Sequence, residues 1–571
     1  MAILQHILLL SLFILTPIAT GQNGERPLVT TKYGQLRGVT VPVKETSRVV
    51  DVFYGVPFAK PPVGPLRFAN PEPAEPWTSV RDASEYPPMC VQVTQYMTFE
   101  REQYQSSIVL PPASEDCLYL NVYTPADRHK ESTLPVMVSI PGGGLVFGAA
   151  STYDGSALSA YENLVFVSIQ YRLGILGFFS TGDDKLPGNY GLLDQVAALR
   201  WVQENIANFG GDPKSITIIG QSAGSLSVSA LVLSPLAKDL FHHAIAESGA
   251  VTMPGLVVSN SKELVPYQEL VANISGCYLA SIADCLKKKS EGVSCYGQSN
   301  DYVLSSSYAM SLQGLIPFPV CVDGVFLPKP VEEILANKEG NKVPLLIGIN
   351  NMEFGYILPL LYNITGISNG MTRETVVEEL QNVPMLPLSN EVISVMVDKY
   401  IGDTTDPLKI RDRFLDMCGD AAFVVQALKF AKYHRDAGLP VYFYEFQQAP
   451  TILALFRPKY VKCDHGDELI SVLGGPFLRN GVFYAGPATP GEKVLSKTVM
   501  KYWANFARTG DPNSPDLTTW LQYGTEEHYL GINLQQKLSS KLKEEEFVFW
   551  TELFPAKIKS QAVGGGDRTE L

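Results

Sequence analysis

The sequence predicts an α/β fold with a mostly parallel central sheet, helices on both faces and large insertions. Several runs of strand length are continuously apolar and rich in β-branched residues, which is typical of strands buried on both faces. Amphipathic helical patterns alternate with these runs, as in parallel β/α architectures. No linker rich in glycine, serine or proline interrupts residues 25–555. We therefore expect one large domain.

Five apolar runs have the length of buried strands. Two long segments between them repeat apolar residues at helical spacing, which predicts helices that cover the sheet. The predicted strands are residues 136–140, 164–171, 216–219, 343–349 and 441–446, and the predicted helices are residues 192–210 and 410–438.

Composition places the chain among globular proteins and argues against some partners. Of its 571 residues, 46% are hydrophobic and 18% are charged, whereas disordered chains are poor in apolar residues. The formal net charge is −13 and no basic run is present, which argues against nucleic acid and anionic membrane surfaces as partners. No cofactor and no metal are expected, and the oligomeric state is left open.

The N-terminus has the pattern of a secretory signal. In MAILQHILLLSLFILTPIATG, an apolar run over residues 7–15 precedes Pro17 and the small residues Ala19 and Gly21. The run is too short for an ordinary transmembrane anchor, so residues 1–21 are predicted to be a cleaved signal peptide. The alternative is a buried helix of a cytosolic protein.

The C-terminus resembles an address for the endoplasmic reticulum. Residues 22–556 form the predicted domain, and residues 557–571 form a tail that ends in Arg568-Thr-Glu-Leu, similar to the KDEL type of retrieval signal. A frayed polar tail is the alternative. With the signal peptide, this ending predicts residence in the lumen of the endoplasmic reticulum, some secretion and a retrieval receptor as a partner. Asn273 and Asn363 begin glycosylation sequons.

Some cysteines should pair in an oxidising compartment. Cys90 with Cys117, and Cys277 with Cys285, would close short loops, although spacing alone does not fix the connectivity. The other four are expected to be free and buried. The eight cysteines are residues 90, 117, 277, 285, 295, 321, 418 and 463.

Ser222 lies at a predicted strand-to-helix turn. The sequence GQSAG places it between Gly220 and Gly224, after a buried strand and before a helix that begins at Ala223. Small residues allow the backbone to turn tightly and expose the hydroxyl, as in a nucleophile elbow. The helix N-terminus offers free N–H groups to a developing negative charge. The alternative is an ordinary turn with an incidental serine.

A serine nucleophile needs a base, and the base needs a carboxylate to orient it. In this architecture the expected chain order is serine, acid, histidine. His465 lies in CDHGDEL, a loop after the strand at residues 441–446, and is the candidate base. His434 is near a helix C-terminus, where a surface cap is expected, and His528 lies in a polar segment expected to be solvated.

Glu353 is the candidate acid because it directly follows the apolar run at residues 343–349. Asp323 is the main rival, but it precedes Gly324 as a turn residue does. Glu445 falls inside a predicted strand. Backbone donors for a tetrahedral oxyanion are expected from the glycines at 142–144, which follow an earlier strand, and from the N–H of Ala223.

Together these residues resemble the type B carboxylesterase and cholinesterase family of α/β-hydrolases, and among its members the vertebrate carboxylesterases. The resemblance covers nearly the whole mature chain. It is carried by EDCLYLNVY, FGGDPKSITIIGQSAGS, NNMEFG, DHGDEL and KYWANFARTGDPN. It implies an α/β-hydrolase fold, a triad of Ser222, Glu353 and His465, oxyanion donors at Gly143, Gly144 and Ala223, and the disulfides Cys90–Cys117 and Cys277–Cys285.

Three positions depart from the pattern of the family. Gln221 stands where glutamate is usual, Pro141 stands where histidine is usual, and Arg568 replaces a histidine in the tail. No triad member is lost. Proline lacks an N–H, but the expected oxyanion donors lie further along the chain.

The leading hypothesis is a serine carboxylic-ester hydrolase that acts through an acyl-enzyme on small-molecule esters, and on amides or thioesters, of lipids or xenobiotics. A cholinesterase is disfavoured, because such relatives hold a quaternary ammonium on a tryptophan that residues 91–116 lack. The remaining alternative is a non-catalytic adhesion or binding module of the same fold. Such members typically lose the serine, whereas this chain keeps Ser222.

Overall fold

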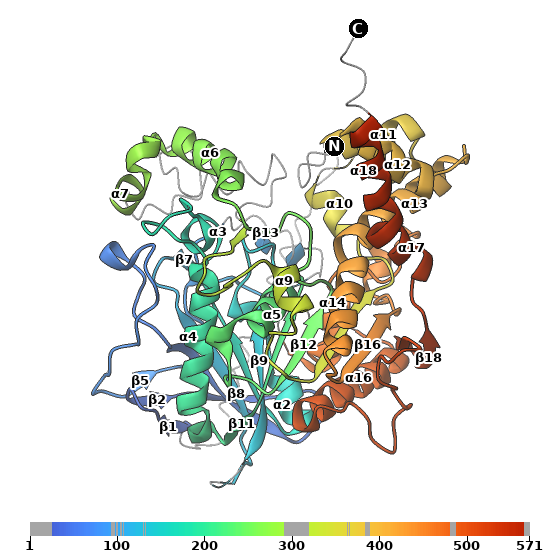
Figure 1. The fold of residues 1–571 in the computed structure, drawn as a ribbon. Helices are drawn as coiled ribbons and strands as arrows, with labels where there is room; N and C mark the ends of the chain where they lie inside the picture. Colours follow the sequence, from blue (N-terminus) through green and yellow to red (C-terminus); the bar gives the residue numbers. More distant parts are fainter. Residues whose placement is uncertain are drawn as a thin grey trace, which may run out of the picture.

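An eleven-stranded mixed sheet forms the centre of the computed structural model (Figure 1). Its strand order is β18-β17-β16-β15-β12-β11-β9-β10-β8-β4-β3, and every neighbouring pair from β17 to β10 is parallel. Antiparallel strands complete both edges. The structure describes residues 26–92, 97–98, 101–102, 106, 108–129, 131, 133–289, 319–362, 364, 366–382, 389–479 and 487–564.

The strands of the central sheet are mostly short, and three smaller sheets lie outside it. The central strands are β3 (Val39–Pro42), β4 (Val49–Pro57), β8 (Tyr119–Pro125), β9 (Leu134–Ile140), β10 (Val165–Ile169), β11 (Gly211–Gln221), β12 (His243–Glu247), β15 (Leu345–Asn350), β16 (Val441–Phe446), β17 (His528–Ile532) and β18 (Lys537–Ser540). The smaller sheets are β1 (Leu28–Thr30), β2 (Gln35–Arg37) and β5 (Arg81–Asp82); β6 (Met89–Cys90) and β7 (Ala113–Ser114); β13 (Val257–Val258) and β14 (Val320–Cys321).

Helices cover both faces of the central sheet, as the continuous apolar strands predict. Successive side chains of one strand point to opposite faces, so Leu345 and Ile347 join one hydrophobic core and Leu346 joins another. The first core contains side chains of α4 (Tyr190–Asn205), α5 (Ala223–Leu233) and α14 (Val425–Asp436), and the second contains side chains of α2 (Ser156–Glu162), α15 (Glu468–Val472) and α16 (Pro490–Thr509).

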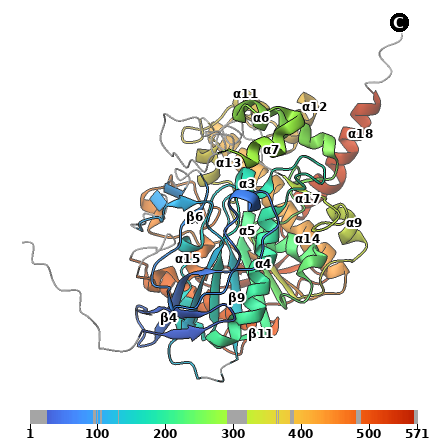
Figure 2. The same ribbon diagram turned by 90° about the vertical axis from the view of Figure 1, so that its left-hand side faces the viewer.

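The insertions lie together at one end of the sheet, at the top of Figures 1 and 2. A third core joins the helices after β15 to Met352 and Phe354, the two neighbours of Glu353. The insertion therefore packs directly against the candidate site. The helices that contribute to this third core are α10 (Ile357–Leu361), α11 (Arg373–Asn382), α12 (Asn390–Tyr400), α13 (Pro407–Gly419) and α18 (Phe554–Gly564). A separate insertion before β15 contains α6 (Val265–Ser275) and α7 (Ile282–Lys287), whose side chains join the first core. The remaining helices are α3 (Gly174–Phe178), α9 (Val331–Ala336) and α17 (Glu544–Val548).

The predicted elements are present, with shifts at their ends. The predicted strand at 441–446 has the bounds of β16, whereas β11 begins at residue 211 rather than 216. The predicted helix at 192–210 is α4 followed by a 3₁₀ turn (Ile206–Phe209). The predicted helix at 410–438 is α13 and α14 joined by a π-helical turn (Asp420–Val424).

Some predictions concern residues outside the described ranges. They are the signal peptide at 1–21, the sequon at Asn363, the free Cys295 and the retrieval signal at Arg568. The other sequon, Asn273, is exposed on α6. Helix α18 continues past residue 556, where the tail is predicted to begin. Within the described ranges, no helix is long and apolar enough to cross a membrane.

Candidate active site

Ser222 occupies a sharp turn between β11 and α5. Its φ of 58° and ψ of −123° are a conformation that non-glycine residues rarely adopt. The residues two positions before and after it must be glycine. A Cβ at Gly220 would lie 2.4 Å from the carbonyl carbon of Gly224. A Cβ at Gly224 would lie 2.1 Å from the carbonyl oxygen of Ile140. The GQSAG segment therefore forms the tight elbow that the sequence predicts, with Ser222 half-buried.

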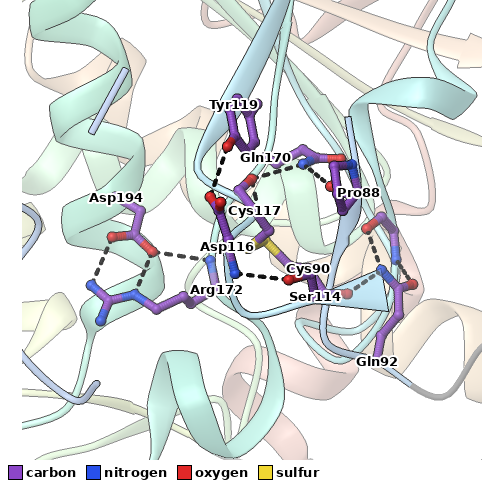
Figure 3. Close-up of a disulfide and its surroundings, with 11 residues drawn as sticks. Pro88, Cys90, Gln92, Ser114, Asp116, Cys117, Tyr119, Gln170, Arg172 and Asp194 are labelled. Atoms are coloured by element: carbon purple, nitrogen blue, oxygen red, sulfur yellow. Dashed lines mark hydrogen bonds and ion pairs between the residues drawn. A yellow bond between two sulfur atoms is a disulfide. The ribbon is translucent and has the colours of Figure 1, made fainter. Parts of the chain in front are cut away.

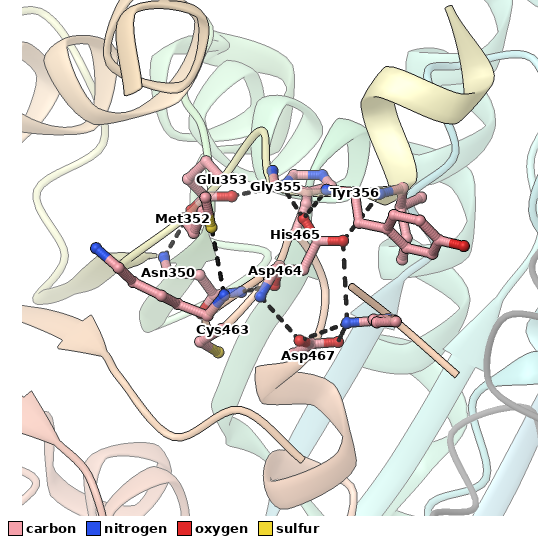
Figure 4. A network of polar contacts seen from close by, with 12 residues as sticks. Asn350, Met352, Glu353, Gly355, Tyr356, Cys463, Asp464, His465 and Asp467 are labelled. Atoms are coloured by element: carbon pink, nitrogen blue, oxygen red, sulfur yellow. Dashed lines mark hydrogen bonds and ion pairs between the residues drawn. The ribbon is translucent and has the colours of Figure 1, made fainter. Parts of the chain in front are cut away.

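His465 and Glu353 lie in contact although 112 positions separate them. Nδ1 of His465 is 2.7 Å from Oε2 of Glu353 (Figure 4). The other carboxylate oxygen accepts a 2.6 Å hydrogen bond from the backbone N–H of Asn350 at the end of β15. Both side chains are buried, at 8% and 0% exposed. The strand end thus fixes the carboxylate, and the carboxylate fixes the imidazole.

Asp464 ties the loop of His465 to the loop of Glu353. Its carboxylate accepts hydrogen bonds from the backbone N–H groups of Gly355, Tyr356 and Ile357, at 2.9 to 3.1 Å (Figure 4). Sequence reasoning did not single out this residue. Its position directly before His465, in a segment with two further acids, is the available signal.

Charge around His465 favours its protonated form. Burial lowers the pKa of the imidazole, but the hydrogen bond and negative charge of Glu353 act in the other direction, with smaller effects from Glu468 and Asp464. The net result is a raised pKa. Burial also raises the pKa of Glu468 to about 8, and the charge of Glu353 adds to that effect.

A glycine loop after β9 faces the elbow. Gly143 and Gly144 have φ values of 113° and 59°, and a Cβ at Gly143 would lie 2.2 Å from the carbonyl oxygen of Phe147. Gly142 donates its N–H to the Tyr153 hydroxyl at 3.0 Å. In contrast, the N–H groups of Gly143, Gly144 and Ala223 donate to no residue that the structure describes.

Comparisons with known proteins show the family of the chain. The profile of the carboxylesterase family matches residues 25–550. The chain belongs to the carboxylesterase family. Carboxylesterase 1D of Rattus norvegicus is 48% identical over 95% of this chain and 96% of its own length. The medium-chain fatty acyl-CoA hydrolase precursor of Anas platyrhynchos is 47% identical over 96% of both chains, and liver carboxylesterase 1 of Oryctolagus cuniculus is 48% identical over 94% and 95%.

The family membership settles the class of reaction and the fold. This carboxylesterase is a serine ester hydrolase with an α/β-hydrolase fold, as the sequence predicts. Among the described residues, no three His, Cys, Asp or Glu side chains gather where they could hold a metal ion.

Both expected disulfides of the carboxylesterase are formed. Cys90 pairs with Cys117, and Cys277 pairs with Cys285. Gln92, two residues after Cys90, exchanges hydrogen bonds of 2.9 and 3.0 Å with the backbone of Gly148, beyond the glycine loop (Figure 3). The first disulfide loop is thus tied to the loop that faces Ser222. Cys321 and Cys463 are free and buried as expected, whereas the free Cys418 is half-buried.

One expectation about the other histidines is wrong. His434 is not a surface cap: it is 5% exposed, and its Nε2 lies 2.7 Å from the carbonyl oxygen of Val343. His528 begins β17 and is half-buried, and the two residues at 525 and 526 in the same segment are exposed. Asp323 behaves as expected of a turn residue, because its carboxylate accepts three backbone N–H bonds from residues 325–327.

Two further side chains contact His465 and were not predicted to do so. The ring of Phe423 is 4.5 Å from the imidazole, centroid to centroid. It belongs to the π-helical turn between α13 and α14, and the continuous helical pattern of residues 410–438 gives no sign of that turn. Nε2 of Gln221 lies 3.2 Å from Nε2 of His465. The sequence marks Gln221 as unusual but does not show this contact.

Proposed function

We propose that Ser222, His465 and Glu353 are the nucleophile, general base and orienting acid of this carboxylesterase. The observation that carries the proposal is the 2.7 Å contact between His465 Nδ1 and Glu353 Oε2. A carboxylate accepts a hydrogen bond, so Nδ1 holds the proton and the lone pair lies at Nε2. That nitrogen is the one that can take a proton from Ser222.

Acylation begins when Ser222 Oγ attacks the carbonyl carbon of the ester. As the new C–O bond forms, the hydroxyl proton moves to Nε2 of His465. The carbon–oxygen bond to the alcohol then breaks, and the leaving oxygen takes the proton back from Nε2. Glu353 stabilises the imidazolium that exists between these two transfers.

Deacylation repeats the same steps with water. Nε2 of His465 removes a proton from the water while its oxygen attacks the acyl carbon. The bond to Ser222 Oγ breaks and the serine recovers its proton from Nε2. The products are one carboxylic acid and one alcohol, so no oxidant, reductant or cofactor is required.

Gly143, Gly144 and Ala223 are proposed to hold the oxyanion. The proposal is supported by their backbone N–H groups, which have no acceptor among the described residues, and by the position of Ala223 at the start of α5. An oxyanion would satisfy all three donors at the moment when the carbonyl oxygen becomes negative. Such donors typically contribute about 10²- to 10³-fold in rate each.

The proposed substrates are small-molecule esters of lipids or xenobiotics, with amides and thioesters as further substrates. The name of the Anas platyrhynchos relative specifies fatty acyl-CoA, which is a thioester. The same acyl-enzyme chemistry cleaves esters and thioesters, because both carry a carbonyl and a leaving group. A panel of p-nitrophenyl esters and acyl-CoA thioesters that varies acyl length would define the preference of this chain.

Labelling with a fluorophosphonate tests the triad directly. The wild-type protein should be labelled at Ser222, and Ser222→Ala should lose both labelling and ester turnover. We expect Ser222→Ala and His465→Ala to lower kcat by about 10⁴- to 10⁶-fold, and Glu353→Gln by about 10⁴-fold. Exposed Ser261→Ala is the matched control. Near-normal turnover of Ser222→Ala would refute the mechanism, and a wild type that is not labelled at Ser222 would refute the proposed triad.

We also propose that the protein enters the secretory route and is retained in the lumen of the endoplasmic reticulum. The supporting sequence features are the signal-like residues 1–21 and the ending Arg568-Thr-Glu-Leu. The word "precursor" in the name of one relative fits such a route. Asn273 is a proposed glycosylation site because it is exposed on α6.

A further inference from the structure

The side chain of Gln221 occupies the position next to His465 that the serine mechanism reserves for Ser222. Its Nε2 is 3.2 Å from Nε2 of His465, whereas the Ser222 hydroxyl makes no hydrogen bond to any described residue. Glu353 accepts at Nδ1, so Nε2 of the neutral imidazole has a lone pair and can only accept. The amide nitrogen of glutamine can only donate. The contact is therefore a hydrogen bond from Gln221 to the lone pair of the base.

The fold holds Gln221 in this place. It is the last residue of β11, where it stands in register with Glu247 of β12, and it is 6% exposed. Its amide oxygen lies on the side of Gly142, 3.3 Å from where a Cβ of that residue would be. A side chain at position 142 would crowd the amide, so the bare glycine leaves room for it. The amide thus lies between the glycine loop and the imidazole.

We propose that Gln221 is a positioning residue that holds the resting His465 through Nε2, so that Ser222 must displace the amide before the imidazole can accept its proton. The proposal rests on the triad proposed above. No covalent bond is made or broken, because one hydrogen bond to Nε2 is exchanged for another. The exchange lowers the reaction rate, because an imidazole whose lone pair already accepts a hydrogen bond is less available to take the proton of Ser222.

None of the ionisable groups that the structure describes near this contact favours the neutral form of His465. Glu353, Glu468 and Asp464 act on His465, and all three favour its protonated form. Glu247, the strand neighbour of Gln221, has a pKa raised by burial and by the charge of Glu468. Gln221 is the group among them that donates to the neutral imidazole, and it therefore favours the neutral form.

Two substitutions of similar shape test the proposal. Gln221→Met removes the donor and adds no charge, so the lone pair of Nε2 becomes free for Ser222. We expect the plateau of kcat/KM and the rate of fluorophosphonate labelling to rise roughly two- to tenfold, the range expected for one net hydrogen bond. The acid limb of the pH profile should move to higher pH, and in Gln221→Glu it should move further, because a carboxylate favours the imidazolium.

The control is Gln195→Met, which also removes a buried amide, one that donates to Ser227. Its pH profile should match that of the wild type. A Gln221→Met plateau that does not rise overturns the proposal, and so does an acid limb that does not move. If Gln221→Met fails to fold, Gln221→Ala is held to the same two criteria. A wild type that is not labelled at Ser222 would instead refute the proposed triad, so the two failures are distinguishable.

Discussion

At the scale of single residues, buried carboxyl groups surround His465 more densely than a triad requires. Glu468 is fully buried, and one of its oxygens accepts a hydrogen bond from the side chain of Asn350. Its other oxygen has no partner among the described residues. Asn350 also donates its backbone N–H to Glu353, so one asparagine contacts two acids. A carboxyl in such a place is more stable neutral than charged.

Glu468→Gln should therefore change how stability depends on pH. The pKa of Glu468 is about 8 in the folded protein, against 4.5 for an ordinary glutamate. The folded state thus holds this proton more tightly than the unfolded chain, and folding stability falls as pH rises from about 4.5 to 8. One proton corresponds to a slope of about 1.4 kcal/mol per pH unit. In the glutamine variant, the unfolding free energy should fall less steeply with pH, by up to that slope.

The measurement is urea unfolding of both forms at several pH values between 5 and 8. Relative to the wild type, Glu468→Gln should gain stability steadily as pH rises. The control is Glu378→Gln on the exposed side of α11, whose stability curve should run parallel to that of the wild type. Parallel curves for Glu468→Gln as well would contradict the prediction.

At the scale of elements, the positions of the site residues depend on loops that are held by disulfides, hydrogen bonds and ion pairs. The Cys90–Cys117 disulfide closes a loop with a sequence separation of 27. The chain on either side of it is fixed by Gln170, which donates from its side chain to the carbonyl oxygens of Pro88 and Cys117 (Figure 3). A buried ion pair between Arg172 and Asp194 lies beside this disulfide.

Removing both cysteines of a disulfide should destabilise the protein more for the longer loop, because the entropy of loop closure grows with the logarithm of loop length. By the chain-entropy relation, the Cys90→Ser/Cys117→Ser variant should lose about 3.5 kcal/mol of unfolding free energy. The Cys277–Cys285 disulfide closes a loop with a separation of only 8, so the Cys277→Ser/Cys285→Ser variant should lose about 2.5 kcal/mol. Non-reducing urea unfolding measures both. A larger loss for the shorter loop would contradict this account.

At the scale of the whole molecule, the proposed location depends on the two ends of the chain rather than on its fold. The final four residues, from Arg568, follow helix α18, which ends at residue 564. A retrieval receptor reads a terminal tetrapeptide as an address. The arginine at its first position differs from the usual histidine of related tails, so partial secretion is expected.

Deleting residues 568–571 should move the enzyme into the medium of expressing cells without changing its activity. The fraction of esterase activity in medium and lysate measures the shift. Replacing Arg568 by His should act in the opposite direction and increase retention. If neither change alters the distribution, the tail does not act as an address.

The sequence by itself determined the fold and the order of the site residues, because both are properties of local chain chemistry. Buried parallel strands require continuous apolar runs, and the tight elbow requires glycine at 220 and 224, since any side chain there would collide with backbone. Chain order then selected Glu353 and His465, and their side chains lie in contact. The two disulfides of the family pattern are also formed.

Only the tertiary structure decided which side chains surround the imidazole. Phe423 reaches His465 because a π-helical turn interrupts α13 and α14, and helical periodicity does not reveal that turn. His434 is buried because α14 packs against the sheet, although a helix end suggests a surface position. The contact of Gln221 with His465 joins residues 244 positions apart. Such contacts depend on how distant segments pack, and a local pattern in the sequence does not record that packing.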